Sequence, residues 1–346
     1  MSFMDLFALM PAYAVFVAVM VFVFGCCMGS FINCLAWRVV NGESVVKGRS
    51  HCAVCGHALS ALDLVPVLSW LCLRGKCRYC GQPIAVRYTV SELMCGVCFL
   101  SVLLVFGIDV QVPFLMALGC VLLGLSLIDL DSMIIPNKFV LAGVLLWVAM
   151  VACQYAAGVA GLSQISAGVD FGVVAGVASG LVENGGNALV PVVDGLLSAV
   201  VIAGLVLVVS CVFKALTGKA GMGMGDIKLY FMVSLYLGLA AGVLNLFLSC
   251  IVGLVFAMVS TGRSGAADAA DGMSVKTMPA DSNGLPEVCA TESAREGESA
   301  SGGKNAQSTG AKAVSKAFPF GPSIAIATWF TLLFGQPLVA AYFSLF

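Results

Sequence analysis

The sequence has 346 residues, of which 60% are apolar and only 10% carry a charged side chain. Soluble domains carry charge on roughly a quarter of their residues, so this composition excludes an ordinary soluble enzyme and indicates a polytopic membrane protein. The net charge of −1 gives no electrostatic basis for a nucleic-acid partner, and the lipid bilayer is the first partner that the composition implies.

The first apolar stretch runs from Leu6 to Phe24, about the length of one bilayer crossing. It lacks the basic start and the small-residue cleavage motif of a signal peptide, so we predict a retained helix over 8–30. A polar segment over 31–88 follows, and it contains two Cys-x-x-Cys pairs.

Apolar stretches of similar length recur after this segment, separated by short polar or Pro-containing turns. We therefore predict an all-α polytopic membrane fold with about eight transmembrane helices and a small polar segment between the first two. The predicted helices are 8–30, 89–107, 112–130, 138–157, 191–213, 226–242, 244–260 and 320–343.

Two further stretches differ from this pattern. Residues 158–190 are rich in Gly, Ala and Val and contain no Lys or Arg, so we interpret them as a loop or re-entrant segment. Residues 261–317 are rich in Ser, Gly and charged residues and hold almost no aromatics, so they cannot offset their ordering entropy and we expect disorder. The predicted divisions of the chain are 1–30, 31–88, 89–260, 261–317 and 318–346.

The basic residues predict an orientation, because cytoplasmic loops of membrane proteins are enriched in Lys and Arg. If the eight helices alternate in direction, four segments on one side hold all 17 Lys and Arg of the chain. We therefore expect the cysteine segment on the cytoplasmic side and both termini on the outer side. The segments on the basic side are 31–88, 131–138, 214–228 and 261–317.

Most of the 15 cysteines stand singly in apolar stretches, where a thiol behaves as a small hydrophobe. The four in the polar segment are different, because two Cys-x-x-Cys turns present four thiolates that suit a tetrahedral zinc ion. They are Cys52, Cys55, Cys77 and Cys80. We predict structural zinc, with redox chemistry and metal-free thiols as alternatives, and we interpret Cys72, His51 and His57 as bystanders.

Two carboxylates at the ends of apolar stretches are the candidate catalytic residues. Asp129 ends one predicted helix, and Asp226 follows the glycine-spaced run 221–225 before another. Ionisable residues at such depths are functional candidates by default, and paired carboxylates work as general acid and general base. Both are predicted to lie at the cytoplasmic ends of their helices.

The alternative is a structural role for both carboxylates. Asp226 would then cap a helix N-terminus, and Asp129 would pair with Lys138 or Lys228. Asp131 competes with Asp129 for the catalytic role, but it lies nearer the loop and is expected to be solvated. Glu92 is expected either to pair with Arg87 or to line the site.

Several motifs, in order along the chain, resemble the bacterial type IV prepilin peptidases. These are bifunctional leader peptidase/N-methyltransferases of the Gly-x-Gly-Asp class of aspartic membrane proteases. The resembling stretches are 29–33, 49–55, 64–71, 74–80, 87–93, 128–137, 221–228 and 319–322, the last two reading Gly-Met-Gly-Met-Gly-Asp-Ile-Lys and Pro-Phe-Gly-Pro.

The resemblance implies residue roles. The family's first catalytic aspartate stands seven residues before the proline of a Pro-Asn motif, which selects Asp129 over Asp131 because Pro136 is that proline. The second is the aspartate of Gly-x-Gly-Asp, Asp226. The four-cysteine set of the family matches the zinc ligands above, and its Gly-Lys pair linked to methyl transfer matches Gly75 and Lys76.

The resemblance also implies the reaction. The family cuts basic leaders from type IV prepilins and type II secretion pseudopilins, and it methylates the new N-terminal residue with S-adenosylmethionine. The expected location is the bacterial inner membrane, with other pilus or secretion components as further partners. A peptidase with an inactive methyltransferase half and a zinc-stapled membrane scaffold without catalysis are the two rival hypotheses.

Overall fold

The computed structural model of the chain describes residues 3–45, 48–159, 190–218, 222–271 and 319–344. The chain divides into two compact units, residues 1–257 with 318–346, and residues 258–317. The membrane helices and the cysteine pairs belong to the first unit. The described residues form helices, with two isolated β-bridges and no sheet among them.

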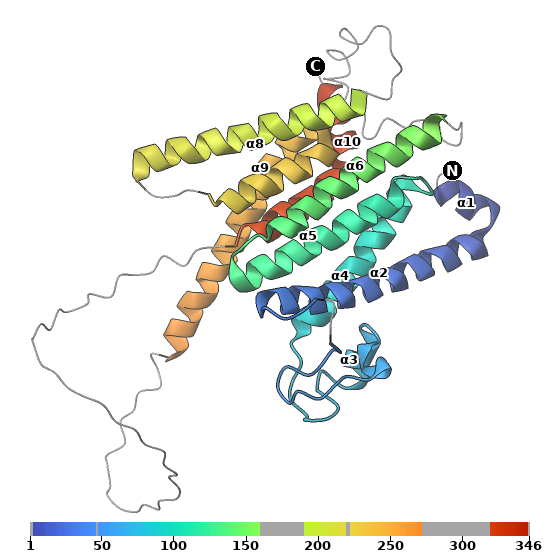
Figure 1. Ribbon diagram of the computed structural model, residues 1–346, viewed down its shortest axis with the longest axis vertical. Coiled ribbons are helices and arrows are strands. Elements are labelled where there is room, and N and C mark those ends of the chain that lie inside the picture. Colours follow the sequence, from blue (N-terminus) through green and yellow to red (C-terminus); the bar gives the residue numbers. More distant parts are fainter. Residues whose placement is uncertain (1–2, 46–47, 160–189, 219–221, 272–318, 345–346) are drawn as a thin grey trace, which may run out of the picture. The chain divides into compact units, whose positions relative to one another are not determined.

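The helices confirm the predicted all-α fold (Figure 1). Among the described residues, six are long and apolar enough to cross a membrane, and a shorter apolar helix spans Gly321–Gly335. The protein is therefore a multi-pass membrane protein. The helices are α1 (Phe3–Leu9), α2 (Pro11–Val40), α3 (Leu68–Cys72), α4 (Val86–Phe106), α5 (Val112–Ser132), α6 (Asn137–Val159), α8 (Val190–Thr217), α9 (Met224–Asp271) and α10 (Gly321–Phe343), with a 3₁₀ turn, η1, at Ala61–Leu64.

The first membrane helix is longer than predicted, because α2 continues to Val40 instead of ending near residue 30. Its two buried polar residues explain the extension. The amide of Asn33 donates to the Tyr88 carbonyl, and the Arg38 guanidinium donates to the carbonyls of Ser44, Val45 and Gly48. A helix can continue through polar residues when each one finds a partner, so the polar segment begins about ten residues later than expected.

The two helices predicted at 226–242 and 244–260 are both present, but their boundary lies at Gly238. This residue has φ 72° and ψ 178°, which interrupts the helical backbone inside α9. Glycine tolerates this conformation because it has no Cβ. On α8, the carboxylate of Asp194 accepts a hydrogen bond from the Leu239 backbone N–H, just after the interruption. The broken helix therefore receives a cap from a neighbouring helix.

Two predicted irregular stretches are described only in part. Helix α9 runs to Asp271, so the disorder predicted from residue 261 is wrong over 261–271. The remainder of that stretch, and residues 160–189 of the predicted re-entrant segment, lie outside the described residues.

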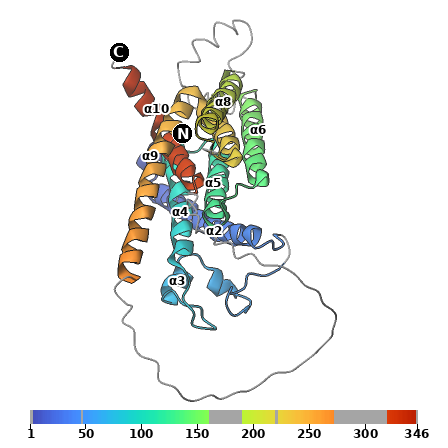
Figure 2. The ribbon, with the colours of Figure 1, turned by 90° about the vertical axis from the view of Figure 1, so that its left-hand side faces the viewer.

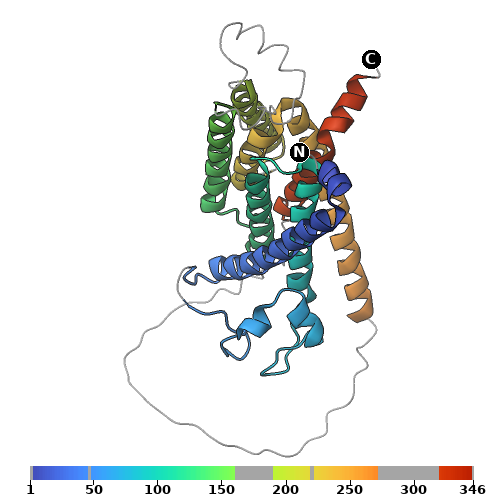
Figure 3. The same cartoon turned by 90° about the vertical axis from the view of Figure 1, so that its right-hand side faces the viewer.

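Helices α2, α4 and α5 lie side by side (Figure 1), and glycines allow α2 and α4 to approach closely. A Cβ built on Gly25 would lie 2.8 Å from the Gly96 Cα, and one on Gly29 would lie 2.8 Å from the Glu92 Cα. Small residues let membrane helices pack backbone to backbone, where dispersion forces are strongest. The polar segment that contains α3 joins the ends of α2 and α4 (Figures 2 and 3).

The largest apolar core is built from α5, α6, α8, α9 and α10. Leu118, Ile202, Tyr230 and Ile324 are fully buried in it. The phenol of Tyr236 donates to the Gly143 carbonyl at 2.6 Å, which links α9 to α6. This core holds the ends of α5, α9 and α10 in fixed relation, and those ends carry the candidate site.

The α2–α4 contact makes a prediction about stability. Gly25→Ala places a methyl group against backbone, so it should destabilise the folded protein by about 1–3 kcal/mol, the usual cost of overpacking. Gly204→Ala on α8 is the matched control, because a Cβ there meets no atom within 4 Å. Thermal unfolding in detergent would measure both, and equal melting temperatures for the two variants would contradict the close packing.

Candidate active site and metal centre

Asp129 lies in the last turn of α5 and is 4% exposed. Its Oδ2 atom accepts a hydrogen bond of 2.8 Å from the backbone N–H of Gly321, the first residue of α10. Its own backbone carbonyl accepts the N–H of Met133, which ends the helix in a left-handed conformation. The carboxylate is thus held between the end of one helix and the start of another.

Asp226 is the third residue of α9, and its backbone N–H donates to the Gly223 carbonyl at 3.2 Å. Its side chain is half-buried and lies close enough to Asp129 for their charges to interact. A Cβ on Gly225 would lie 3.0 Å from the Ile135 Cβ, so the glycine run allows the start of α9 to approach the turn after α5. The structure therefore brings the two predicted catalytic aspartates together.

The alternative partners of Asp129 are not observed. Among the described residues, neither Asp129 nor Asp226 takes part in an ion pair. The ammonium group of Lys228 instead donates to the Asn137 side chain at 3.0 Å. This bond links the Gly-x-Gly-Asp motif to the Pro-Asn motif, and it occupies one of the two lysines that were alternative partners of Asp129.

Asp131 and Asp129 have different partners. Asp131 forms a bidentate ion pair with Arg87, with nitrogen–oxygen distances of 2.6 Å and 3.3 Å. Of the two alternatives expected for Glu92, pairing with Arg87 is therefore wrong, and lining the site is not tested by these contacts. Glu92 accepts the Val67 backbone N–H at 2.8 Å, where Val67 has φ 61° in a tight turn. A valine with positive φ is strained, so this carboxylate holds an unfavourable turn in place.

The four predicted zinc ligands form one cluster. The Sγ atoms of Cys52, Cys55, Cys77 and Cys80 all lie within 4.8 Å of one another, and the Cys52 and Cys80 atoms are 4.0 Å apart. Tetrahedral zinc with Zn–S bonds of about 2.3 Å needs sulfur atoms about 3.8 Å apart. The cluster therefore fits a zinc ion without rearrangement of the backbone.

The two Cys-x-x-Cys turns have the same geometry. In each, the glycine after the second cysteine donates its N–H to the carbonyl of the first cysteine at 2.9 Å. Gly56 and Gly81 have φ of 68° and 72°, which favours glycine at both positions. Each turn is closed by an isolated β-bridge, His51 with Ala58 and Lys76 with Pro83.

Backbone amides prepare one of these thiols for metal binding. The N–H groups of Cys55 and then Val54 point at the Cys52 sulfur and lower the pKa of that thiol to about 6. A thiolate is the form that binds zinc, so the turn favours the ligand form near neutral pH.

A second set of contacts joins the two cysteine turns. Asp63 accepts hydrogen bonds from the Ser60 hydroxyl at 2.7 Å, the Arg78 guanidinium at 2.7 Å and the Tyr79 phenol at 2.9 Å. The Tyr79 ring lies 3.8 Å from the ring of His57. His57 therefore contacts an aromatic ring and lies outside the thiolate cluster.

The Gly75-Lys76 pair lies between α3 and the second cysteine turn. Gly75 is buried with φ 71°, and a Cβ there would lie 2.8 Å from the Trp70 ring, so packing alone requires glycine. Lys76 is exposed. The structure thus explains the glycine physically and leaves the lysine side chain on the surface.

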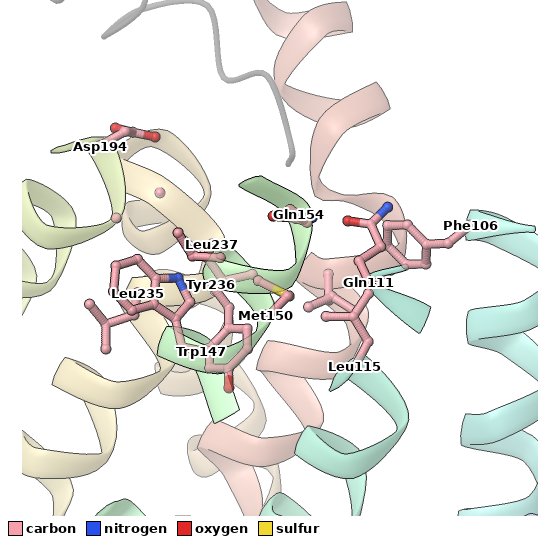
Figure 4. Close-up of a pocket in the computed structure, with 14 residues that line it drawn as sticks. Phe106, Gln111, Leu115, Trp147, Met150, Gln154, Asp194, Leu235, Tyr236 and Leu237 are labelled. Carbon is pink, nitrogen blue, oxygen red and sulfur yellow. The ribbon is translucent and has the colours of Figure 1, made fainter. Parts of the chain in front are cut away.

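Sequence reasoning missed two residues of interest. One is Gly321, which lies in the resembling stretch 319–322 but was given no role, and whose amide reaches Asp129 from 192 residues away. The other is Asp194, which lines a cavity of about 40 Å³ with Gln111 and Gln154 (Figure 4). Neither candidate catalytic aspartate lines that cavity. The signal for Asp194 was available, since it is a carboxylate inside an apolar stretch.

The fold and site define a multi-pass membrane protein with a carboxylate pair, one member buried and one half-buried, and a four-thiolate centre. Residues 23–106 match the family described as the bacterial peptidase A24 N-terminal domain, and residues 116–258 match the type IV leader peptidase family. The chain belongs to the type IV leader peptidase family.

Individual relatives agree with this assignment. A prepilin leader peptidase/N-methyltransferase of Pseudomonas putida is 28% identical over 367 residues, covering 100% of this chain and 99% of the relative. One of Stutzerimonas stutzeri is 29% identical, over 85% of this chain and 74% of the relative. One of Myxococcus xanthus is 41% identical, over 40% of this chain and 41% of the relative. No solved structure matches the chain.

The thiolate cluster makes a prediction about metal content. Purified protein should hold one zinc ion per chain, and Cys77→Ser should lose it, because Cys77 is the buried ligand. Cys72→Ser is the control, since that exposed thiol lies outside the cluster. Elemental analysis of detergent-purified protein would measure both. Metal-free protein whose thiols oxidise reversibly would favour the redox hypothesis.

Asp63 makes a prediction about pH. Its hydrogen bonds, led by the Ser60 hydroxyl, lower its pKa from 3.8 to about 2. The ionised Asp63 carboxylate therefore stabilises the folded cysteine segment above about pH 4, and this stabilisation is lost as the pH falls from about 4 to 2. Asp63→Asn should lower stability at neutral pH by about 1.5 kcal/mol, roughly tenfold in the opening of the cysteine segment. Limited proteolysis of that segment at pH 7 would measure this, and wild-type cleavage rates in the variant would contradict it.

Proposed function

We propose that the protein is an aspartic endopeptidase that removes the leader peptide of type IV prepilins or type II secretion pseudopilins. We further propose that it methylates the newly exposed N-terminal residue with S-adenosylmethionine as donor. The convergence of Asp129 and Asp226 is the observation that carries the peptidase half. The curated names of the relatives support both halves.

The carboxylate pair supports hydrolysis without a covalent intermediate. A water molecule attacks the scissile carbonyl while one carboxylate takes a proton from this water. The other carboxyl group gives a proton to the departing amine. Two carboxyl groups that share one proton suit these two roles. Asp131 has no place in this chemistry, because both of its oxygens accept hydrogen bonds from Arg87.

The location of the pair suits a membrane-anchored substrate. We propose that the protein lies in the bacterial inner membrane with both termini outside, and that the cysteine segment and the two aspartates are on the cytoplasmic side. All 17 Lys and Arg fall on that side when the helices alternate, which supports this orientation. A prepilin carries a basic leader on the cytoplasmic side of an apolar helix, so its scissile bond would meet the pair at the membrane surface.

The zinc ion would be structural in this protein. Cys52, Cys55, Cys77 and Cys80 would hold it, and four thiolates leave no open position for a substrate. Its contribution would be to cross-link a small segment that has little apolar core of its own. The role of this segment in methyl transfer, including Gly75 and Lys76, rests on the family resemblance.

The carboxylate pair makes a prediction about cleavage. Asp129→Asn and Asp226→Asn should each lower cleavage of a purified prepilin by at least about 1,000-fold, since an amide cannot exchange the required proton. Asp131→Asn should keep activity within several-fold of wild type. Gel-shift cleavage assays in detergent or liposomes would measure all three, with zinc content as the control for folding.

Two outcomes would contradict the proposal. Normal cleavage by the Asp129 or Asp226 variant would refute the acid–base pair and favour the scaffold hypothesis. Cleavage by the wild type without transfer of label from a methyl-labelled donor would leave a peptidase only.

A further inference from the structure

The contact between Gly321 and Asp129 is the longest-range hydrogen bond in the described part of the site. Gly321 is the first residue of α10, a helix of 23 residues, and its N–H lies 2.8 Å from the Asp129 Oδ2 atom. The N-terminus of a helix presents unpaired amides and a partial positive charge, so it favours a carboxylate.

The local sequence directs this one amide at Asp129. Pro322 has no backbone N–H to compete for the carboxylate. The N–H groups of Ser323 and Ile324 both donate to the Phe320 carbonyl, at 3.1 Å and 3.2 Å. Of the first four residues of α10, therefore, only Gly321 has an amide that reaches the catalytic carboxylate.

Glycine is required here because of space. A Cβ on Gly321 would lie 2.7 Å from Asp129 Oδ2, 3.1 Å from Cγ and 3.2 Å from Cβ. Real Cβ atoms essentially never approach within 3.0 Å of another heavy atom, so even alanine would push the carboxylate or the start of α10 away. The backbone of Gly321 is not in the left-handed region, so its backbone conformation does not by itself require glycine.

Packing on both sides of Gly321 prevents the start of α10 from moving away from Asp129. The Phe320 ring packs directly against Gly253 of α9, where it occupies the space that a Cβ would need. Further along α10, the Trp329 ring packs against Gly119 of α5, and its indole N–H donates to the Ser101 hydroxyl at 3.3 Å. The start of α10 is thus held against α9, and its next turns are held against α5 and α4.

We propose that Gly321 is a positioning residue for the peptidase reaction. Its amide fixes the Oδ2 atom of Asp129, so we assign the proton exchange with the attacking water to Oδ1. This inference rests on the proposed function, because it assigns a role to Asp129 as a catalytic group. It adds the Pro-Phe-Gly-Pro stretch at 319–322 to the active site.

Gly321→Ala tests the proposal. A carboxylate displaced by a fraction of an ångström should lower kcat by roughly 10- to 100-fold, because acid–base geometry is sensitive to small shifts. KM should stay within about twofold, since Gly321 is not proposed to bind the substrate. Gly204→Ala is the matched control and should show wild-type kcat and KM, because a Cβ there meets no atom within 4 Å.

Two readouts separate positioning from a general structural role. Zinc content and methyl transfer to a pre-cleaved pilin should remain at wild-type levels in Gly321→Ala, whereas a global packing defect would lower them together with cleavage. Wild-type kcat in Gly321→Ala, alongside inactive Asp129→Asn, would overturn the positioning role and leave the proposed function intact. Cleavage by Asp129→Asn would instead overturn both.

A cysteine pair tests the geometry even if Gly321→Ala fails to fold. A Cβ at 321 lies 3.2 Å from the Asp129 Cβ, close to the roughly 3.5–4.5 Å that a disulfide needs. Asp129→Cys combined with Gly321→Cys should therefore cross-link on mild oxidation, as seen by mass spectrometry of the linked peptides. The matched control combines Asp131→Cys and Gly321→Cys with Asp129→Ala, which removes the clashing carboxylate, and it should not cross-link. Equal cross-linking of both proteins, or of neither, would overturn the inference.

Discussion

Asp129 is a carboxylate that is 4% exposed at the end of a membrane helix. A buried carboxylate without hydrogen-bond partners is strongly destabilising, so the chain must bring partners to it. It does so with the N-terminus of α10 and places Asp226 at the start of α9 nearby. These helix ends can approach closely because Gly225 and Gly321 have no side chain. A Cβ at either position would keep the ends apart.

The cysteine segment is connected to this site through two side chains of α4. Arg87 pairs with Asp131, two residues after the catalytic candidate on α5, and Glu92 holds the strained turn at Val67. On its other side, Arg38 at the end of α2 satisfies three loop carbonyls. These polar contacts attach the cysteine segment to the helices, since the segment is too small to be held by apolar burial alone. The proposed zinc ion would stabilise the interior of the segment.

The lengths of the apolar stretches predicted the membrane helices well and their ends less well. The apolar stretches located every long helix, because membrane burial demands about twenty apolar residues in succession. The end of α2 was wrong because Asn33 and Arg38 appear as loop residues until their partners are known. The interruption of α9 was misplaced because the sequence does not show that Gly238 takes a non-helical conformation or that Asp194 of α8 accepts the Leu239 amide beside it.

The sequence by itself indicated the class of protein, the long apolar helices and the four-thiolate centre, because each depends on composition or on spacing within one segment. The family resemblance then selected the two candidate aspartates. Only the tertiary structure decided which groups touch those aspartates. It paired Asp131 with Arg87, Glu92 with Val67, and Asp129 with the amide of Gly321. Asp129 and Gly321 are 192 residues apart, and the Pro-Phe-Gly-Pro motif marks the glycine without showing that it leaves space for a distant carboxylate.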